Sequence, residues 1–426
     1  MKKIILFTAI LFSASKLFSQ QLARATDVQM VTTAGTKIVL SGGGISFIGT
    51  SLLTSTADSI YLIKSSATSP EGWLDSTAAG VMAGSSTGHV FFMGNNRQSF
   101  YGKTKFYDFT LRNTGGDTLL SSCEVRNLLH LDTGYIFTKS GYGNDSLLVS
   151  NTAPAAIVST SNFGKSWVHG RLSRTENQTG AANEYLFPIG KIKLPDSLYA
   201  PIKLDKFNST TNTYTAEYFP AKPFNNTIIN NPPVDHISSV EYWEISATIP
   251  NTSDADVKVS LSWRTYSQVS PLASVRDSLI VAQYVDNAGF KWDKTGTFGL
   301  HVKTDLPDQT FGYIKHRDYI GALTFLERRH TLGTMSKYNA LPVRLVYFTA
   351  VADGNRVRLN WEAANEQDTR TYEIEKSLTG SNFSHFTNVA SRQQVQSDYV
   401  EYDPNPALGW NYYRLKIIDK QGNFTY

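Results

Sequence analysis

Apolar and polar residues alternate in short runs along most of the chain. Val257, Val259 and Leu261 alternate with Lys258 and Ser260, which is the period-two pattern of a strand with one solvent-facing side. No stretch shows the apolar period of an amphipathic helix. Tyr, Phe and Trp number 22, 23 and 7, and these residue types suit a pleated, half-buried surface. The pattern predicts an all-β fold.

The region from 21 to 170 contains short predicted strands separated by Gly, Ser, Asn and Asp turns. They are Lys37 to Leu40, Ile45 to Phe47, Ile60 to Ile63, Val90 to Met93, Phe106 to Leu111, Leu128 to Leu131 and Leu147 to Val149. Short strands about 20 residues apart are typical of a β-solenoid, in which each coil buries its apolar side against its neighbours. A sandwich with long loops is the alternative.

The region from 171 to 335 contains longer predicted strands and is interpreted as a central β-sandwich. Its strands include Tyr214 to Tyr218, Glu241 to Ile245, Val257 to Trp263 and Leu279 to Tyr284. Phe224 to Pro233 is rich in Pro and Asn, which predicts an exposed connection. Gly333 to Ala340 is interpreted as a linker to the next domain.

The last region, 341 to 426, is predicted to be a small sandwich. Its strands are Val343 to Thr349, Val357 to Trp361, Tyr372 to Lys376 and Tyr412 to Lys416, with a turn at Gly354. Trp361 on an early strand and Tyr413 on a late one are candidates for the structural core between two packed sheets.

This last region resembles a fibronectin type III domain, with Trp361 in the second-strand position and Tyr413 as the corner tyrosine. The segments LPVRLVYFTA, VRLNWEAANEQDTRTYEIEKS and NYYRLKIIDKQGNFTY resemble the module that precedes the sorting domain in Bacteroidetes proteins exported by type IX secretion. The resemblance implies export and surface-attachment machinery as partners. It also implies a sorting domain after Tyr426, so we expect this domain to be truncated or the sorting signal to be missing.

The N-terminus has the layout of a secretory signal peptide over residues 1–20. Lys2 and Lys3 precede the apolar run Ile4 to Phe12, and small or polar residues follow, with cleavage expected near Ser19 or Gln20. The apolar run is too short for a membrane-spanning helix, and no later segment is long enough. We therefore expect an exported protein, at the cell surface or released, with no transmembrane segment after cleavage.

Charge and cysteine content exclude several classes of protein. Loss of Lys2, Lys3 and Lys16 with the leader takes the 40 basic residues to 37, against 36 acidic ones, and such a surface offers no footprint for nucleic acid. Arg328 to His330 is the densest basic stretch and is interpreted as a solvated loop. The single cysteine, Cys123, has no partner for an internal disulfide.

No motif indicates catalysis, a metal or a cofactor. Gly84 to Gly88 matches G-x-S-x-G, but a predicted strand follows where a hydrolase needs a helix. The eight histidines are scattered without the spacing of a zinc pair. Asp254 and Asp256 lack the rest of a calcium loop, and Gly141 to Gly143 lacks the third glycine of a dinucleotide loop. The three segments Gly84 to Gly88, Asp254 to Asp256 and Gly141 to Gly143 are each interpreted as a turn.

The tryptophans remain as candidates for ligand binding, because exposed aromatic rings bind sugars and peptides. Trp243, Trp263 and Trp361 lie at strand positions that predict a core role. Trp73, Trp292 and Trp410 lie near turns, where they either contact a ligand or cover the end of a sandwich.

The resemblance to Bacteroidetes surface proteins also implies O-glycosylation, at Asp followed by Ser or Thr and then an apolar residue or Thr. The alternative is that each Asp opens a turn by hydrogen bonding to nearby backbone. Six positions match, and the candidate acceptors are Ser59, Ser76, Thr118, Ser146, Ser197 and Ser278.

These observations predict a non-catalytic surface or secreted protein with a structural, adhesive or ligand-binding role, and they leave a glycan or a protein open as its ligand. The alternative is an extracellular hydrolase or lyase acting on polysaccharide or peptide, whose carboxylates lie on neighbouring coils where sequence spacing does not reveal them. Two carboxyl groups about 5 to 10 Å apart in a cleft would indicate that alternative.

Overall fold

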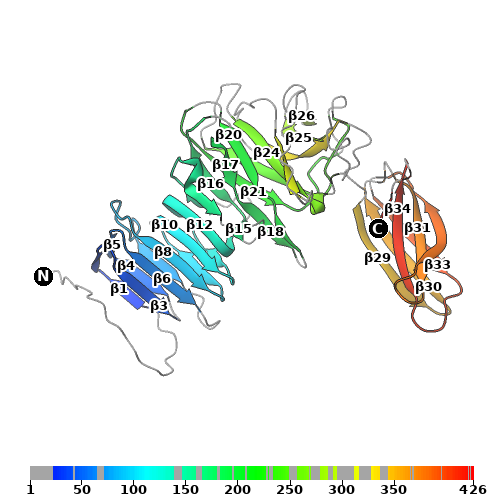
Figure 1. Cartoon of the computed structure of the whole chain (residues 1–426), viewed down its shortest axis with the longest axis horizontal. Coiled ribbons are helices and arrows are strands. Elements are labelled where there is room, and N and C mark those ends of the chain that lie inside the picture. The colour runs from blue at the N-terminus through cyan, green and yellow to red at the C-terminus, as the bar shows by residue number, and fades with distance from the viewer. Residues whose placement is uncertain are drawn as a thin grey trace.

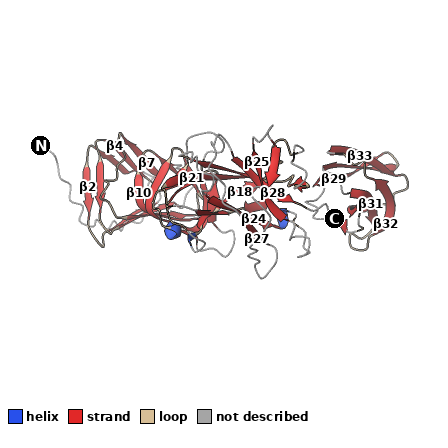
Figure 2. Cartoon of the chain, turned by 90° about the horizontal axis from the view of Figure 1, so that it is seen from above, coloured by secondary structure: helices blue, strands red, loops and turns tan. Residues whose placement is uncertain are grey.

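The fold was analysed on a computed structural model, and the all-β prediction is confirmed. The structure describes residues 23–41, 44–64, 72–138, 146–159, 166–179, 183–193, 196–206, 209–226, 229, 234–248, 257–267, 269, 279–285, 291–294, 311–315, 328–335, 344–364, 366, 369–394, 396–420, 422 and 424–426. These residues form strands throughout, with two short 3₁₀ turns, η1 (Pro154–Ala156) and η3 (Thr265–Ser267). Figure 2 shows strands along the whole length. The predicted signal peptide lies outside the described residues.

Parallel strands stack into one face of a solenoid near the N-terminus (Figure 1). This face consists of β1 (Ala23–Thr26), β4 (Ile45–Gly49), β7 (Trp73–Thr77), β9 (Gln98–Tyr101), β11 (Asp117–Leu119), the end of β12 (Cys123–Phe137), β15 (Ser166–His169) and β18 (Ile189–Lys193). Parallel pairing between successive coils is the arrangement that the solenoid prediction requires.

The opposite face is built from the strands that follow in each coil. It consists of β3 (Lys37–Ser41), β6 (Ser59–Lys64), β8 (His89–Gly94), β10 (Lys105–Asn113), the start of β12, β13 (Leu147–Val149), β14 (Ile157–Ser159) and β16 (Leu172–Glu176). The first two coils also carry a short third face, β2 (Gln29–Thr32) and β5 (Leu52–Ser55). Every strand predicted in this region is present, so the solenoid interpretation is confirmed.

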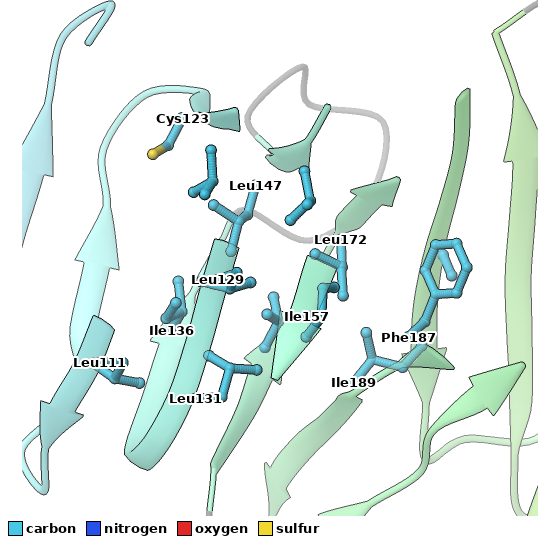
Figure 3. Close-up of a cluster of buried hydrophobic side chains, with 14 of the residues drawn as sticks. Leu111, Cys123, Leu129, Leu131, Ile136, Leu147, Ile157, Leu172, Phe187 and Ile189 are labelled. Atoms are coloured by element: carbon cyan, nitrogen blue, oxygen red, sulfur yellow. The ribbon is translucent and has the colours of Figure 1, made fainter. Parts of the chain in front are cut away.

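Alternating apolar residues fill the space between the two faces. In β6 and β8 every second side chain is buried, as the pleat of a strand dictates. Figure 3 shows Leu129, Leu131 and Ile136 of β12 pointing inward beside Leu147 and Ile157. The single cysteine, Cys123, is buried in this layer, which raises the pKa of its thiol well above the usual range. It packs as a small apolar residue.

A central sandwich of antiparallel strands follows the solenoid; one of its sheets continues the face that ends at β16, and the other is a separate four-stranded sheet. One sheet runs from β16 through β21 (Asn212–Phe219), β23 (Tyr242–Ala247), β28 (Arg328–Thr334) and β25 (Leu279–Val285) to β26 (Lys291–Lys294), with β22 (His236–Ile237) beside β28. The other consists of β17 (Tyr185–Phe187), β20 (Ile202–Lys206), β24 (Val257–Arg264) and β27 (Phe311–Lys315), while β19 (Asp196–Tyr199) pairs with β18.

The solenoid and the sandwich share one hydrophobic core. A single cluster of buried residues runs from Ile45 in the solenoid to Leu332 in the sandwich. Strand β16 pairs in parallel with β13 on one side and antiparallel with β21 on the other. The sandwich therefore covers the C-terminal end of the solenoid core, and the change near residue 170 is a change of pairing direction within one sheet.

Two predictions in this region are wrong. Gly333 belongs to β28, where it pairs with Ile280, and only residues beyond the strand remain available for a linker. Arg328 to His330 is the first part of the same strand: His330 is buried, and Arg329 forms an ion pair with Glu244 at 3.0 Å. The basic residues predicted a loop because charged residues usually lie in solvent. They belong instead to a strand between β23 and β25.

The single wet face predicted for β24 is also wrong. Val257, Val259 and Leu261 are buried as expected, but Ser260 is buried as well, at 2 % exposure. Strand β24 lies between β20 and β27, and its hydroxyl side is covered too. Of the exposed connection predicted from Phe224, the structure describes a turn at 224–226 and little more.

The last region forms two sheets with a core of their own, as predicted for a small sandwich. One sheet consists of β29 (Arg344–Asp353), β30 (Arg356–Ala364) and β33 (Gln396–Asp403), and the other of β32 (Ser384–Ala390), β31 (Thr369–Ser377), β34 (Tyr412–Asp419) and β35 (Phe424–Thr425). Trp361 is fully buried at the centre of this core and stacks on Tyr399 at 4.9 Å between ring centroids.

A buried carboxylate fixes the crossing between these two sheets. Glu366 is fully buried and accepts hydrogen bonds from the hydroxyl groups of Tyr372 on β31 and of Ser397 and Tyr399 on β33. Burial and the bond to Glu366 raise the pKa of both tyrosines. Since buried carboxylates need such donors, the tyrosines join Glu366 to both sheets, Tyr372 from β31 and Tyr399 from β33.

A second buried charge lies inside the central sandwich. Glu241 is fully buried and Arg264 nearly so, and an Arg264 Nη2 group donates to Glu241 Oε2. The same nitrogen donates to the hydroxyl of Tyr218 at 2.7 Å, and that hydroxyl donates to Glu241 Oε2 at 2.8 Å. All three contacts converge on Glu241 Oε2 and Arg264 Nη2, whereas Glu241 Oε1 and Arg264 Nε have no hydrogen-bond partner among the described residues.

Replacing Arg264 with Met alone should lower the free energy of unfolding by about 3–5 kcal/mol, because it leaves the Glu241 carboxylate buried and unpaired. The double variant Arg264→Met, Glu241→Leu should recover much of this loss, because no buried charge remains. Urea unfolding of the two variants measures both values. Lys105→Met, at an ion pair whose lysine is 59 % exposed, is the control and should change stability by about 0–1 kcal/mol. A double variant no more stable than the single one would contradict the explanation.

The solenoid face that contains β1, β4 and β15 carries on its outer side a histidine that favours its neutral form. His169 packs edge-on against Phe137 at 5.1 Å between ring centroids. Burial, with smaller contributions from the charges of Lys191 and Arg97, lowers the pKa of His169 from 6.5 to about 4. A proton therefore binds the unfolded chain more readily than the folded one.

Between pH 6.5 and pH 4 the wild-type chain should lose stability as pH falls, since the unfolded state takes up the proton first. His169→Gln should show a smaller loss over the same interval and no difference in slope above it. Thermal melts at closely spaced pH values would show this difference. Parallel curves for the two proteins would refute the assignment.

Candidate binding face

One solenoid face carries aromatic and polar side chains in register on its outer side. The pleat that buries Ile60 and Leu62 in β6 points their neighbours outward. Parallel pairing then aligns the outward residues of β6, β8, β10 and β12. We call this set the ladder face: Ser59, Tyr61, Ile63, His89, Phe91, Met93, Asp108, Thr110, Arg112, Leu128, His130 and Asp132.

Stacked rings form the centre of the ladder face. Tyr61 and Phe91 lie 4.7 Å apart between ring centroids at an interplanar angle of 11°. His89 stacks on Phe91 at 4.0 Å and lies 5.5 Å from His130. Because these rings face one another, they present their edges outward, and most remain half-buried. The result is a surface of mixed apolar and polar character.

Hydrogen bonds fix the polar side chains of the ladder face. A ring nitrogen of His89, Nε2, lies 2.6 Å from the hydroxyl of Thr110. Burial is the largest influence on His89 and lowers the pKa of its imidazole, which therefore stays neutral at neutral pH. Asp108 accepts bonds from the backbone N–H of Leu128 at 3.0 Å and from Asn127 at 2.7 Å. These contacts hold neighbouring strands in register.

The charges of this face are balanced pair by pair. Arg112 and Asp132 form an ion pair at 2.6 Å, and at its border Lys105 and Glu124 form another at 2.8 Å. Each carboxylate of the face thus has a donor on an adjacent strand. The arrangement supplies hydrogen-bonding groups and apolar contact, and its carboxylates serve to join strands.

Sequence spacing could not reveal the ladder face. His89 and His130 lie two coils apart in the chain, and they come together only because β10 lies between β8 and β12. The usable signal was an outward aromatic residue or histidine on β6, β8 and β12. Placing these residues side by side also required the number of residues in each intervening coil.

The candidate glycosylation sites differ in exposure. Ser76 and Ser197 are exposed, whereas Ser59, Thr118 and Ser146 are half-buried, and Ser278 lies outside the described residues. Ser59 is part of the ladder face.

Some of the aspartates that precede these sites have structural partners. Asp75 is buried and accepts bonds from the N–H groups of Thr77 at 3.0 Å and Val81 at 2.8 Å. Asp58 accepts from the hydroxyls of Thr32 and Ser55. At Asp75 the geometry is that of a turn-opening aspartate.

The tryptophans divide differently from the prediction. Trp243, Trp263 and Trp361 are buried, as expected. Trp73 and Trp292, candidates for ligand contact, are also fully buried.

Buried partners explain this result. The indole N–H of Trp73 donates to Thr104 at 2.8 Å and that of Trp292 to the carbonyl of Phe224 at 3.0 Å. Trp410 alone of the three candidates is exposed, at 81 %.

Tyr413, the other predicted core residue, is half-buried. Its ring packs against the core of the C-terminal sandwich. Its hydroxyl donates to Asp403 at 2.6 Å, an aspartate that also pairs with Lys376.

Among the remaining sequence motifs, the one that the structure describes forms a turn, as predicted. Gly84 to Gly88 forms a turn before β8, and Ser86 inside it is buried and donates to the carbonyl of Leu53 at 3.1 Å. Gly141 to Gly143, Asp254 and Asp256 lie outside the described residues. Over the described ranges no three His, Cys, Asp or Glu side chains gather as a metal site, and no helix there is long and apolar enough to cross a membrane.

Comparison with known proteins adds little to this description. No family model matches the chain, and no curated protein matches it. Among solved structures, a β-1,2-glucanase from Parabacteroides distasonis is similar over 60 % of this chain and 35 % of its own length, with 11 % identity and a TM-score of 0.15. A similarity at that score carries no argument about fold or activity.

Proposed function

We propose that this chain is an exported, non-catalytic protein of the bacterial surface or secretome, whose ladder face binds a neutral, extended glycan. The ladder face is the observation that carries the proposal. Its outward side chains follow one another on successive strands at about 4.8 Å, so an extended polymer laid along the solenoid meets Tyr61, Phe91, Thr110 and His130 in turn. Balanced ion pairs and a neutral His89 favour an uncharged ligand.

The other parts of the chain support this role. The central sandwich covers one end of the solenoid. We propose that the C-terminal sandwich is a fibronectin type III-like spacer, supported by its sheets of three and four strands, by Trp361 on the second strand and by Tyr413 on a late strand. The resemblance to modules of type IX cargo supports attachment at, or release from, the outer surface.

The double variant Tyr61→Thr, Phe91→Thr should weaken glycan binding about tenfold or more, which corresponds to about 1.4 kcal/mol. Threonine keeps the preference for a strand, and a thermal melt checks folding. The measurement is affinity electrophoresis in gels that contain neutral or uronic-acid polysaccharides. Tyr101→Thr is the matched control, since Tyr101 is 47 % exposed on the opposite solenoid face.

Two results would count against the ladder face as the binding site. One is a wild-type chain that binds none of the neutral polysaccharides. The other is a Tyr101→Thr variant that loses as much binding as the double variant.

Fractionation of the native bacterium should place the protein on the cell surface or in the medium, without residues 1–20. Intact mass of this exported protein should exceed the sequence mass through glycosylation, and Ser76→Ala or Ser197→Ala should reduce the excess, because these two acceptors are exposed. Protein confined to the cytoplasm would overturn the export proposal. Exported protein without excess mass would overturn glycosylation alone.

A further inference from the structure

A cluster of polar side chains lies inside the solenoid, away from the ladder face. Lys64, Gln98, Asn113 and Asp117 are each at most 2 % exposed. Lys64 and Asn113 follow the alternation that buries Leu62 and Leu111, and Gln98 and Asp117 are buried residues of β9 and β11 in the other solenoid face. A lysine and an aspartate are rarely buried this completely, so their presence inside an apolar core requires an explanation.

Strand register places Lys64 and Asn113 on either side of one glycine. Lys64 at the end of β6 pairs with Gly94, and Gly94 pairs with Asn113 at the end of β10. Glycine leaves the position between them without a side chain, and neighbouring strands lie about 4.8 Å apart. The flexible four-carbon stem of lysine is long enough to cross this gap, and the charge of Lys64 acts on Asp117.

The surroundings of Asp117 favour attack by an amine on its carboxyl carbon. Asn113 Nδ2 donates to Asp117 Oδ1 at 2.9 Å, which polarises that carbonyl, whereas Oδ2 has no hydrogen-bond partner. Burial raises the pKa of Asp117 to about 7, with opposing contributions from Asn113 and from the charge of Lys64. Its carboxyl group is thus neutral in much of the population at neutral pH.

The C-terminal sandwich contains a contrasting lysine–aspartate pair. Lys376 forms an ion pair with Asp403, which also accepts from Tyr413. Burial opposes ionisation there, but the bonds from Lys376 and Tyr413 prevail and lower the pKa of Asp403. That pair is an ordinary salt bridge, and it lacks the neutral carboxyl group and the unpartnered oxygen of Asp117.

We propose that Lys64 and Asp117 join in an intramolecular amide bond inside the solenoid. A proton passes from the Lys64 ammonium to the Asp117 carboxylate, giving a free amine and a carboxylic acid. The amine lone pair forms an Nζ–Cγ bond, while Asn113 donates to the developing oxyanion at Oδ1. The Cγ–Oδ2 bond breaks, and one water molecule leaves with the second amine proton. The reaction requires no oxidant, metal or cofactor.

Mass spectrometry of the purified full chain tests the bond. A proteolytic digest should contain one branched peptide that includes both Lys64 and Asp117, lighter than the sum of its two linear peptides by one water. Because the test follows a single peptide pair, leader removal and glycosylation elsewhere do not affect it. Lys64→Arg and Asp117→Ala should each abolish the branched peptide, whereas Lys376→Arg should leave it intact.

Two outcomes would overturn the proposal. If the wild-type digest contains only the linear peptides of Lys64 and Asp117, no bond forms. If the branched peptide is lighter by ammonia and includes Asn113 as the linked residue, the electrophile is the asparagine and the assignment to Asp117 is wrong. Both results come from wild-type protein, so the test stands even where a variant fails to fold.

Discussion

Parallel backbone pairing between successive coils is the constraint on which the rest of the structure depends. Each strand of the solenoid satisfies its N–H and C=O groups on the coils before and after it, so every coil must keep the same inward and outward alternation as its neighbours. A slip of one residue in β8 would place Phe92 on the surface and Phe91 in the core. The ladder face, the internal polar cluster and the apolar layer of Figure 3 all follow from that single register.

The sequence was sufficient for the class of fold and for the strands of the solenoid. Local alternation and turn residues mark strands such as β13, whose bounds match the predicted Leu147 to Val149, because these signals lie within a few residues of one another. Pairing partners lie a coil away, and coil length varies, so the meeting of His89 with His130 was out of reach. Local patterns say which residues share a strand face and not which strands are neighbours.

The errors have a common physical cause. Arg328 to His330 was assigned to a loop and Ser260 to a wet face, because charge and polarity usually mark solvent. In the folded chain β28 and β24 are inner strands of their sheets, where polar groups are retained by partners from distant segments. Glu241 and Arg264 show the same effect: each is buried because it bonds to the other and to Tyr218, and no local pattern indicates this.

The position of β28 determines how the molecule bears load. The connection to the C-terminal sandwich leaves from the end of β28, which lies between β23 and β25 rather than at an edge. Tension transmitted through that connection pulls a strand along its own length against neighbours on both sides, so several hydrogen bonds must break together. A pull on the chain at this end is therefore resisted by β23 and β25 at once, whereas an edge strand would separate one bond at a time.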